Sequence, residues 1–421
     1  AMPADRPSFV DLLSDAGYRT HGIGKCHFTP DGLALRGFQS REYQEEIVAA
    51  PEQDDYLTYL HANGFAHICD PHGIRGEMYY VPQPAQMPAA LHPTQWIGDR
   101  TVDFLQAQTS SQPWMLFTSF IHPHPPFAPP NPWHKLYRAP QMPLPNVPQD
   151  AAALHTYINK MQNRYKYRDQ GIDLNLVRCL KAYYYAVISF IDYQVGRILD
   201  TLTQTGQLEN TLIIFTSDHG EMLGDYNCFG KRSMHNSCAR VPLLVRHPQI
   251  DDIGVQCAAP ASLVDVAPTI LSACGIPLER DRWDGEDLRQ VAGGSCQREH
   301  VFIQHDRGSR GLYTVVGAQW KYSYSAPDNQ EYLFDRIRDP QETRNCADTA
   351  FTSAAQRRMK DILINFLHEG GEEQALDGHD WRHYPTLTVP RNPDAGLFTQ
   401  DHPWADQTIP GYTDEKDPAT I

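Results

Sequence analysis

The chain has 421 residues, enough for two or three domains or for one large α/β domain with a small companion. With 41% apolar and 21% charged residues, its composition is typical of a globular protein and excludes disorder over most of the length. The net charge of −15 excludes a general nucleic-acid binder, but a small anionic substrate can still bind in a local cationic pocket.

The first half of the chain predicts helices and strands separated by long loops. Residues 8–17 predict a helix with Ser8 as its N-cap, and residues 18–24 a short strand. Residues 94–108 predict a helix and residues 114–120 a buried strand. Residues 30–93 and 128–150 are rich in Pro and predict irregular loops. The strongest predicted helix spans residues 174–203, where apolar residues recur every three or four positions.

In the second half, the pattern of predicted elements changes near residue 300, from alternating strands and helices to consecutive short strands. Residues 211–216 predict a strand buried on both faces, residues 241–246 another strand, and residues 262–273 a helix. This alternation favours an α/β fold whose large, mostly parallel sheet is flanked by helices. Residues 300–304, 311–316, 320–325 and 331–335 then predict a small antiparallel sheet, and residues 354–369 a closing helix. We therefore expect an α/β domain over 1–295, an α+β subdomain over 296–370 and an extended surface tail over 371–421.

Several features bear on localisation. The longest apolar run, residues 183–191, is too short to span a bilayer, and no membrane partner is expected. The nine cysteines form no CxxC pair, and the sequence has no N-x-S/T acceptor site. These features favour a reducing, cytoplasmic compartment.

Three predicted strands end in polar clusters, and ligands of open parallel sheets bind beyond the carboxyl ends of the strands. The clusters and the loop after the third supply two lysines, five histidines and one aspartate: Lys25 and His27; His122 and His124; Asp218 and His219; Lys231 and His235. The lysines are suited to the oxygens of a tetrahedral anion, and a histidine can protonate a leaving alkoxide. Lys25 and His27 alternate on an extended segment and are expected to point to one side.

Asp218 and His219 have a second possible role, because a carboxylate and an imidazole are both metal ligands. Two ligands cannot hold a metal alone. The alternative is that Asp218 is a turn residue or a helix N-cap and that His219 is incidental. For any one lysine, the alternative is a solvated surface charge.

Several segments resemble the sulfatases of the alkaline phosphatase superfamily. They are TLIIFTSDHGEMLGD at 211–225, GKRSM at 230–234, RVPLLV at 240–245, AGYRT at 16–20, GIGKCH at 22–27, HPHPPF at 122–127 and YLFD at 332–335. The match covers about 350 residues in the family's order. The resemblance implies an alkaline phosphatase-like fold and a hydrolase acting on a small sulfated or phosphorylated substrate. A homo-oligomer is possible.

The resemblance also implies roles for individual residues. Asp218 and His219 correspond to ligands of a divalent ion, calcium in most members. A second set corresponds to the residues that hold the sulfate oxygens and protonate the leaving group: Lys25, His27, His122 and Lys231. We add His124 and His235 as candidate substrate-binding residues.

The chain departs from the family pattern in one respect that matters chemically. It contains no Cys (or Ser)-x-Pro-x-Arg motif, whose first residue becomes the formylglycine nucleophile, and no strand ending in paired aspartates. Cys69-Asp70-Pro71 begins such a motif, but Arg75 comes two positions late. We therefore expect an N-terminally truncated sulfatase that is itself inactive and binds calcium weakly or not at all. A non-catalytic anion-binding protein and a phosphonate or phosphodiester hydrolase remain the alternatives.

Overall fold

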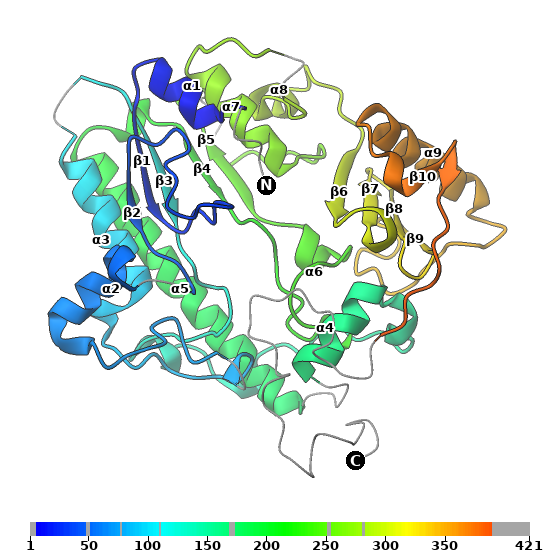
Figure 1. Ribbon diagram of the computed structural model, residues 1–421, viewed down its shortest axis with the longest axis horizontal. Helices are drawn as coiled ribbons and strands as arrows, with labels where there is room; N and C mark the ends of the chain where they lie inside the picture. The colour runs from blue at the N-terminus through cyan, green and yellow to red at the C-terminus, as the bar shows by residue number, and fades with distance from the viewer. Residues whose placement is uncertain are drawn as a thin grey trace.

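A computed structural model gives the structure of the protein and describes residues 6–47, 51–75, 78–108, 111–167, 173–250, 254–279 and 283–389. The mixed α/β class is confirmed, with parallel strands in the N-terminal part and an antiparallel sheet in the C-terminal part (Figure 1). Within the described ranges, no helix combines the length and the apolarity needed to cross a membrane.

A three-stranded parallel sheet carries the first part of the site. Strand β1 (Arg19–Gly24) lies between β2 (Ser40–Tyr43) and β3 (Trp114–Ser119). Helix α1 (Phe9–Asp15) leads into β1, and Ser8 caps it as predicted by accepting from the backbone N–H of Asp11. The sheet was expected from its strands β1 and β3, whereas β2 falls in a segment predicted to be irregular.

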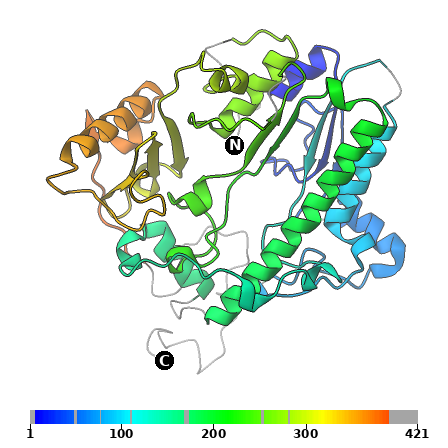
Figure 2. The same ribbon diagram turned by 180° about the vertical axis from the view of Figure 1, so that it is seen from behind.

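Two long helices cover one face of this sheet. Helices α3 (Pro93–Gln106) and α5 (Leu174–Gln204) contact each other, and Figure 2 shows α5 running diagonally across the molecule. Buried apolar side chains from both helices and from β1 form one core, among them Ile23, Trp96, Ile97, Phe104 and Leu202. The period of apolar residues along α5 thus predicted this helix to within one residue of its C-terminal end.

Strands β4 (Ile213–Thr216) and β5 (Leu243–Arg246) pair in antiparallel fashion beside β3, as a separate two-stranded sheet (Figures 1 and 2). The prediction that β4 is buried on both faces is wrong, because 40% of Phe215 is exposed. Leu244 and Val245 on β5 are exposed as well. In the described part of the chain, β4 forms a ladder with β5 alone, so its apolar sequence is only partly covered.

The C-terminal part is a second core. Strands β6 (Val301–His305), β7 (Leu312–Val316), β8 (Trp320–Ser325) and β9 (Gln330–Asp335) form an antiparallel sheet in chain order, against which α9 (Ser353–Glu369) packs. A short hairpin of β10 (Leu376–Asp377) and β11 (Asp380–Trp381) follows. Trp381 is buried, stacks on Tyr324 at 4.2 Å between ring centroids, and donates its Nε1–H to the Tyr322 hydroxyl at 2.7 Å.

The remaining α-helices are α2 (Asp55–Leu60), α4 (Tyr157–Tyr167), α6 (Asn236–Ala239), α7 (Val266–Ala273) and α8 (Leu288–Ala292). Helix α2 adds Tyr56, Leu57 and Leu60 to the core of α3, α5 and β1. Of the predicted tail, residues 390–421 lie outside the described residues, and so do Ala1 and Met2. The domain boundaries near 295 and 370 stay a prediction.

Candidate anion site

The site begins where two parallel strands end. Lys25 directly follows β1 and His124 follows β3, and the parallel pairing of these strands puts their carboxyl ends at one edge. A buried carboxylate joins them. Lys25 Nζ lies 3.2 Å from Glu46 Oε1, and His124 Nδ1 lies 3.0 Å from Glu46 Oε2. The Glu46 side chain is 2% exposed.

Two further cations complete this group. Arg75 places a guanidinium nitrogen 3.9 Å from Glu46 Oε2 and lies over the Tyr79 ring. The pKa of Lys231 is lowered by burial and then by the charge of Lys25, while the nearby Asp218 and Glu46 carboxylates oppose that shift. We call Lys25, Glu46, Arg75, His124 and Lys231 the anion-site cluster.

A closed loop positions Lys231. Residues 222–230 fold back so that Met222 and Gly230 are joined by a backbone hydrogen bond of 3.0 Å. The carboxylate of Glu221 accepts from Gly230 N–H at 2.5 Å and from the Tyr80 hydroxyl at 3.0 Å. The lysine is therefore held on a braced turn, and its own carbonyl oxygen accepts from the Gln162 side-chain amide.

His124 has a defined tautomer. Its Nδ1 faces two groups that can only accept, the Pro125 carbonyl oxygen at 2.7 Å and Glu46 Oε2 at 3.0 Å, so Nδ1 carries the proton. The neutral ring then has its lone pair on Nε2. Burial holds the pKa of His124 well below its usual range, and the charges of Lys231 and Lys25 add to this shift.

His122, predicted to be catalytic, packs in a group of buried histidines. It is 2% exposed, its Nδ1 is 3.4 Å from the Thr94 hydroxyl, and its ring stacks on His92 at 5.0 Å. His72 packs on the same ring. Burial lowers the pKa of His122 to about 4. Among the described contacts, His124 shares Glu46 with Lys25, whereas His122 contacts Thr94, His92 and His72.

His27 also departs from the expected arrangement. Its φ of 49° lies in the left-handed region, so the segment after Lys25 is not extended and the alternation argument does not apply. The half-exposed ring places Nδ1 3.8 Å from Glu45 Oε2, while its backbone N–H donates to Glu45 Oε1. His27 and Lys25 therefore reach adjacent glutamates of the same loop.

Asp218 and His219 follow β4. The Asp218 side chain is 82% exposed, and its Oδ2 lies 3.3 Å from His219 Nε2. His219 also contacts the Gly220 carbonyl oxygen through Nδ1. Over the described ranges, no three His, Cys, Asp or Glu side chains gather as a metal-ligand set. These two donors do not fit a calcium site by themselves, because calcium takes six to eight oxygen ligands.

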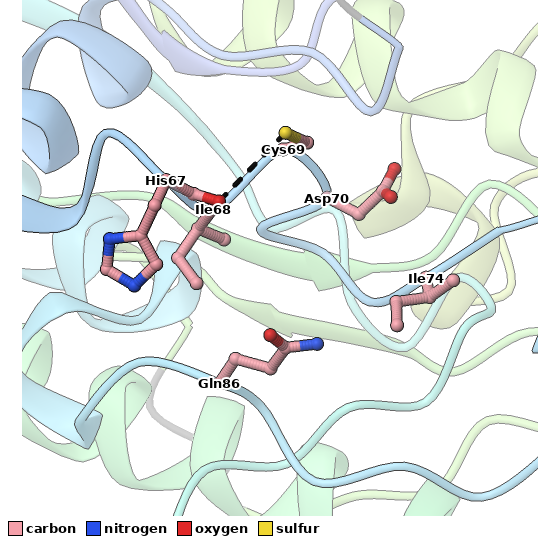
Figure 3. A pocket seen from close by; sticks show the side chains of 6 residues that line it. All are labelled: His67, Ile68, Cys69, Asp70, Ile74 and Gln86. Carbon is pink, nitrogen blue, oxygen red and sulfur yellow. Dashed lines mark hydrogen bonds between the residues drawn. The ribbon is translucent and has the colours of Figure 1, made fainter.

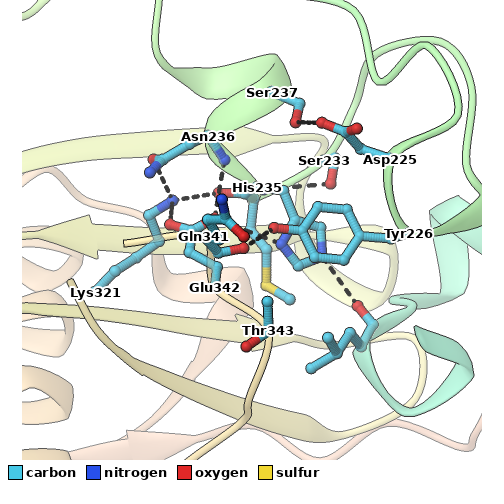
Figure 4. Close-up of polar contacts among 12 residues, drawn as sticks. Asp225, Tyr226, Ser233, His235, Asn236, Ser237, Lys321, Gln341, Glu342 and Thr343 are labelled. Atoms are coloured by element: carbon cyan, nitrogen blue, oxygen red, sulfur yellow. Dashed lines mark hydrogen bonds and ion pairs between the residues drawn. The ribbon is translucent and has the colours of Figure 1, made fainter. Parts of the chain in front are cut away.

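His235, predicted to bind substrate, is wholly buried in a different network (Figure 4). Its ring stacks on Tyr226 at 3.9 Å, its Nε2 donates to the Leu154 carbonyl oxygen at 3.1 Å, and its Nδ1 lies 3.5 Å from Glu342 Oε2. The structure does not bring His235 to the anion-site cluster. It places the ring between the loop that carries Lys231 and the C-terminal sheet.

A buried lysine from β8 completes this network. Lys321 Nζ forms an ion pair with Glu342 Oε1 and donates to the Met234 carbonyl oxygen at 2.9 Å and to Asn236 Oδ1 at 2.8 Å. The Lys321 and Glu342 side chains are each 1% exposed. Through these contacts the second core holds the loop that runs from Lys231 to α6. We call Lys321, Glu342, His235 and Asn236 the buried ion network.

The buried ion network predicts a specific loss of stability in acid. Burial raises the pKa of Glu342, but the hydrogen bond from His235 and the charge of Lys321 outweigh burial and bring the pKa to about 2 from a usual 4.5. Because the folded-state pKa is the lower one, this stabilisation is complete above pH 4.5 and is lost as the pH falls towards 2. Urea unfolding from pH 7 to pH 3 should show a shallower acid loss in Glu342→Gln than in the wild type. Parallel curves would contradict this.

The segment that resembles an incomplete nucleophile motif lines a shallow pocket of about 200 Å³ (Figure 3). Its lining residues are His67, Ile68, Cys69, Asp70, Ile74 and Gln86. The Cys69 thiol contacts the His67 carbonyl oxygen at 4.0 Å and is exposed. All nine cysteines are free of disulfides.

Sequence reasoning missed Glu46, Arg75 and Glu221. Glu46 and Arg75 lie in the segment predicted to be irregular, which has no periodic pattern to place them. The one local signal was the pair of adjacent carboxylates, Glu45 and Glu46, in the segment that follows the predicted cations Lys25 and His27. Glu221 was visible inside the family-like segment, but its role depends on contacts with Gly230 and Tyr80 that spacing does not reveal.

Comparison with known proteins assigns the class. The sulfatase family model matches residues 2–276, and a model described as N-sulphoglucosamine sulphohydrolase, C-terminal, matches residues 224–369. Since the first match covers more than half of the chain, the chain belongs to the sulfatase family, within the alkaline phosphatase superfamily. The predicted resemblance is confirmed, and the chain is a sulfatase-type hydrolase by family.

Individual relatives agree with this assignment. An arylsulfatase from Clostridium perfringens is 30% identical over 412 residues, which cover 90% of this chain and 81% of the relative. A choline-sulfatase from Rhizobium meliloti is 31% identical over 363 residues, 81% of this chain and 67% of the relative. A phosphonate monoester hydrolase from Silicibacter pomeroyi shares the fold, with a TM-score of 0.73 at 22% identity, covering 91% of this chain and 85% of that protein.

Proposed function

We propose that the anion-site cluster binds the tetrahedral anion of a small sulfate ester. The observation that supports this most directly is that Lys25 and His124 meet at Glu46 beyond the ends of β1 and β3, where the charge of Lys231 also acts on His124. Ammonium groups form charge-assisted hydrogen bonds with sulfate oxygens. The site lies in an acidic chain, so its local positive charge is a feature of the cluster and not of the overall composition.

In this proposal the lysines hold the non-bridging oxygens and His124 handles the proton. The neutral His124 ring, with its lone pair on Nε2, cannot donate from that atom. Burial lowers the pKa of His124 most, and a bound anion would offset the further lowering by the charges of Lys231 and Lys25. It would therefore favour the imidazolium form, which can protonate a leaving alkoxide.

The nucleophile is a separate matter. The sequence holds no Cys (or Ser)-x-Pro-x-Arg motif, and among the described residues no three His, Cys, Asp or Glu side chains gather as a metal-ligand set. We propose that this chain binds the ester without turning it over, since bound cations do not replace a nucleophile. Calcium binding is correspondingly proposed to be weak or absent.

A phosphonate monoester is the second candidate substrate, supported by the fold shared with the hydrolase from Silicibacter pomeroyi. Phosphonate monoesters and sulfate monoesters both present a tetrahedral, singly charged group. Parallel titrations of the chain with an aryl sulfate and an aryl phosphonate monoester would separate the two, because the preferred ester should give the lower Kd.

Binding by the chain itself tests the proposal. Isothermal titration with phenyl sulfate should give a single site, and Lys25→Gln or Lys231→Gln should weaken it by about tenfold or more, because a charge-assisted contact is lost. Lys135→Gln, which removes a lysine from the loop after β3, serves as the control and should bind as the wild type does. Unchanged affinity in both site variants would refute the proposed site.

A further inference from the structure

Glu46 is a negative charge inside a site proposed to bind anions. Its carboxylate is almost fully buried and lies within 4 Å of Lys25, His124 and Arg75. Its two carboxylate oxygens face these charged groups, Lys25 at Oε1 and His124 and Arg75 at Oε2. A buried carboxylate persists only where such cations offset its desolvation.

The carboxylate changes the potential that a ligand meets. Lys25, Arg75 and Lys231 supply three positive charges, and Glu46 cancels one of them. Coulomb energy is proportional to the product of the two charges, so the attraction lost because of Glu46 is about twice as large for a doubly charged ligand as for a singly charged one. The burial of the carboxylate limits screening by salt, which keeps this difference large.

The three classes of ester that could bind here do not all carry the same charge near neutral pH. A sulfate monoester and a phosphonate monoester each carry one negative charge. A phosphate monoester carries close to two, since its second pKa is about 6. All three present tetrahedral oxygens of similar size, so shape alone discriminates weakly among them.

We propose that Glu46 is a specificity determinant, which makes the anion-site cluster select singly charged tetrahedral esters over doubly charged phosphate monoesters. This inference rests on the proposed function, because it assumes that the cluster is where the anion binds. It assigns Glu46 a role in rejecting the wrong ligand, separate from the contacts that hold the right one.

The test is a comparison of three probes at pH 7.5: phenyl sulfate, phenyl methylphosphonate and phenyl phosphate. Titration calorimetry gives the Kd of each for the wild type, Glu46→Gln and Glu46→Asp. Glu46→Gln should tighten phenyl phosphate by about tenfold more than either singly charged probe. Glu46→Asp keeps the charge and should keep the wild-type ranking. Glu42→Gln is the matched control, because Glu42 lies on β2 and pairs with His21 outside the cluster.

Each outcome decides between explanations. An equal change for all three probes in Glu46→Gln would overturn charge selection and leave Glu46 as a support for Lys25 and His124. If the wild type binds none of the probes, the anion site itself is refuted, and this inference with it. Should Glu46→Gln fail to fold, the same titrations are made with Arg75→Gln, which changes the charge of the cluster in the opposite direction. It removes a positive charge and should weaken phenyl phosphate about tenfold more than phenyl sulfate, and an equal loss would contradict the proposal.

Discussion

Replacing Glu342 by glutamine is expected to lower the free energy of unfolding by roughly 3–5 kcal/mol, the cost of removing one partner from a buried ion pair. The substitution keeps the shape of the side chain but leaves the ammonium group of Lys321 without its counter-charge in a site that is 1% exposed. It also weakens the contact with His235 and removes the charged acceptor of the Asn236 backbone N–H. Urea unfolding followed by circular dichroism at pH 7 measures the change.

Glu299→Gln is the matched control for this prediction. Glu299 makes the same kind of ion pair in the same part of the chain, with Arg358 at 3.9 Å, but both side chains are mostly exposed. Exposed pairs contribute little to stability, so the control should unfold as the wild type does. A loss below about 1 kcal/mol in Glu342→Gln would show that the network does not stabilise the fold.

Replacing Trp381 by alanine is expected to cost roughly 3–5 kcal/mol, because a large buried ring leaves a cavity that the core cannot refill. The ring stacks on Tyr324 and donates to Tyr322, so its removal also leaves a buried hydroxyl with one partner fewer. His379→Ala, an exposed position in the same hairpin, is the control. Thermal unfolding at the wild-type temperature in Trp381→Ala would mean that the buried ring does not stabilise the C-terminal core.

Local patterns in the sequence predicted the elements that depend on nearby residues. Ser8 and Asp11 are three positions apart and form the cap that was expected. The apolar period of α5 predicted a helix of 31 residues almost to its ends. Strand β2 was missed because its four residues, SREY, are short, polar and without apolar alternation. Its place is set by pairing with β1, which no local pattern records.

The candidate site was only partly predicted for the same reason, because local patterns do not record contacts between distant residues. Lys25 and a histidine of the 122–127 segment each follow a parallel strand, and this position correctly predicted that they lie at one edge of the sheet. The two histidines of that segment are equivalent in the sequence, and only the path of the loop decides that His124 faces Lys25 while His122 packs on His92. His235 was assigned to the site by its nearness to Lys231 in sequence. Its partner Glu342 lies 107 positions away, so no spacing could have indicated the buried ion network.

Diffraction from crystals soaked in sodium perrhenate tests the central claim most directly, because perrhenate is a tetrahedral monoanion, singly charged like a sulfate ester, and scatters anomalously. We expect a single strong anomalous peak within hydrogen-bonding distance of Lys25 Nζ and Lys231 Nζ, beside His124, and a weaker peak at the same place in Lys231→Gln. A principal peak elsewhere on the molecule, or an undiminished peak in Lys231→Gln, would contradict the assignment of the anion site to this cluster.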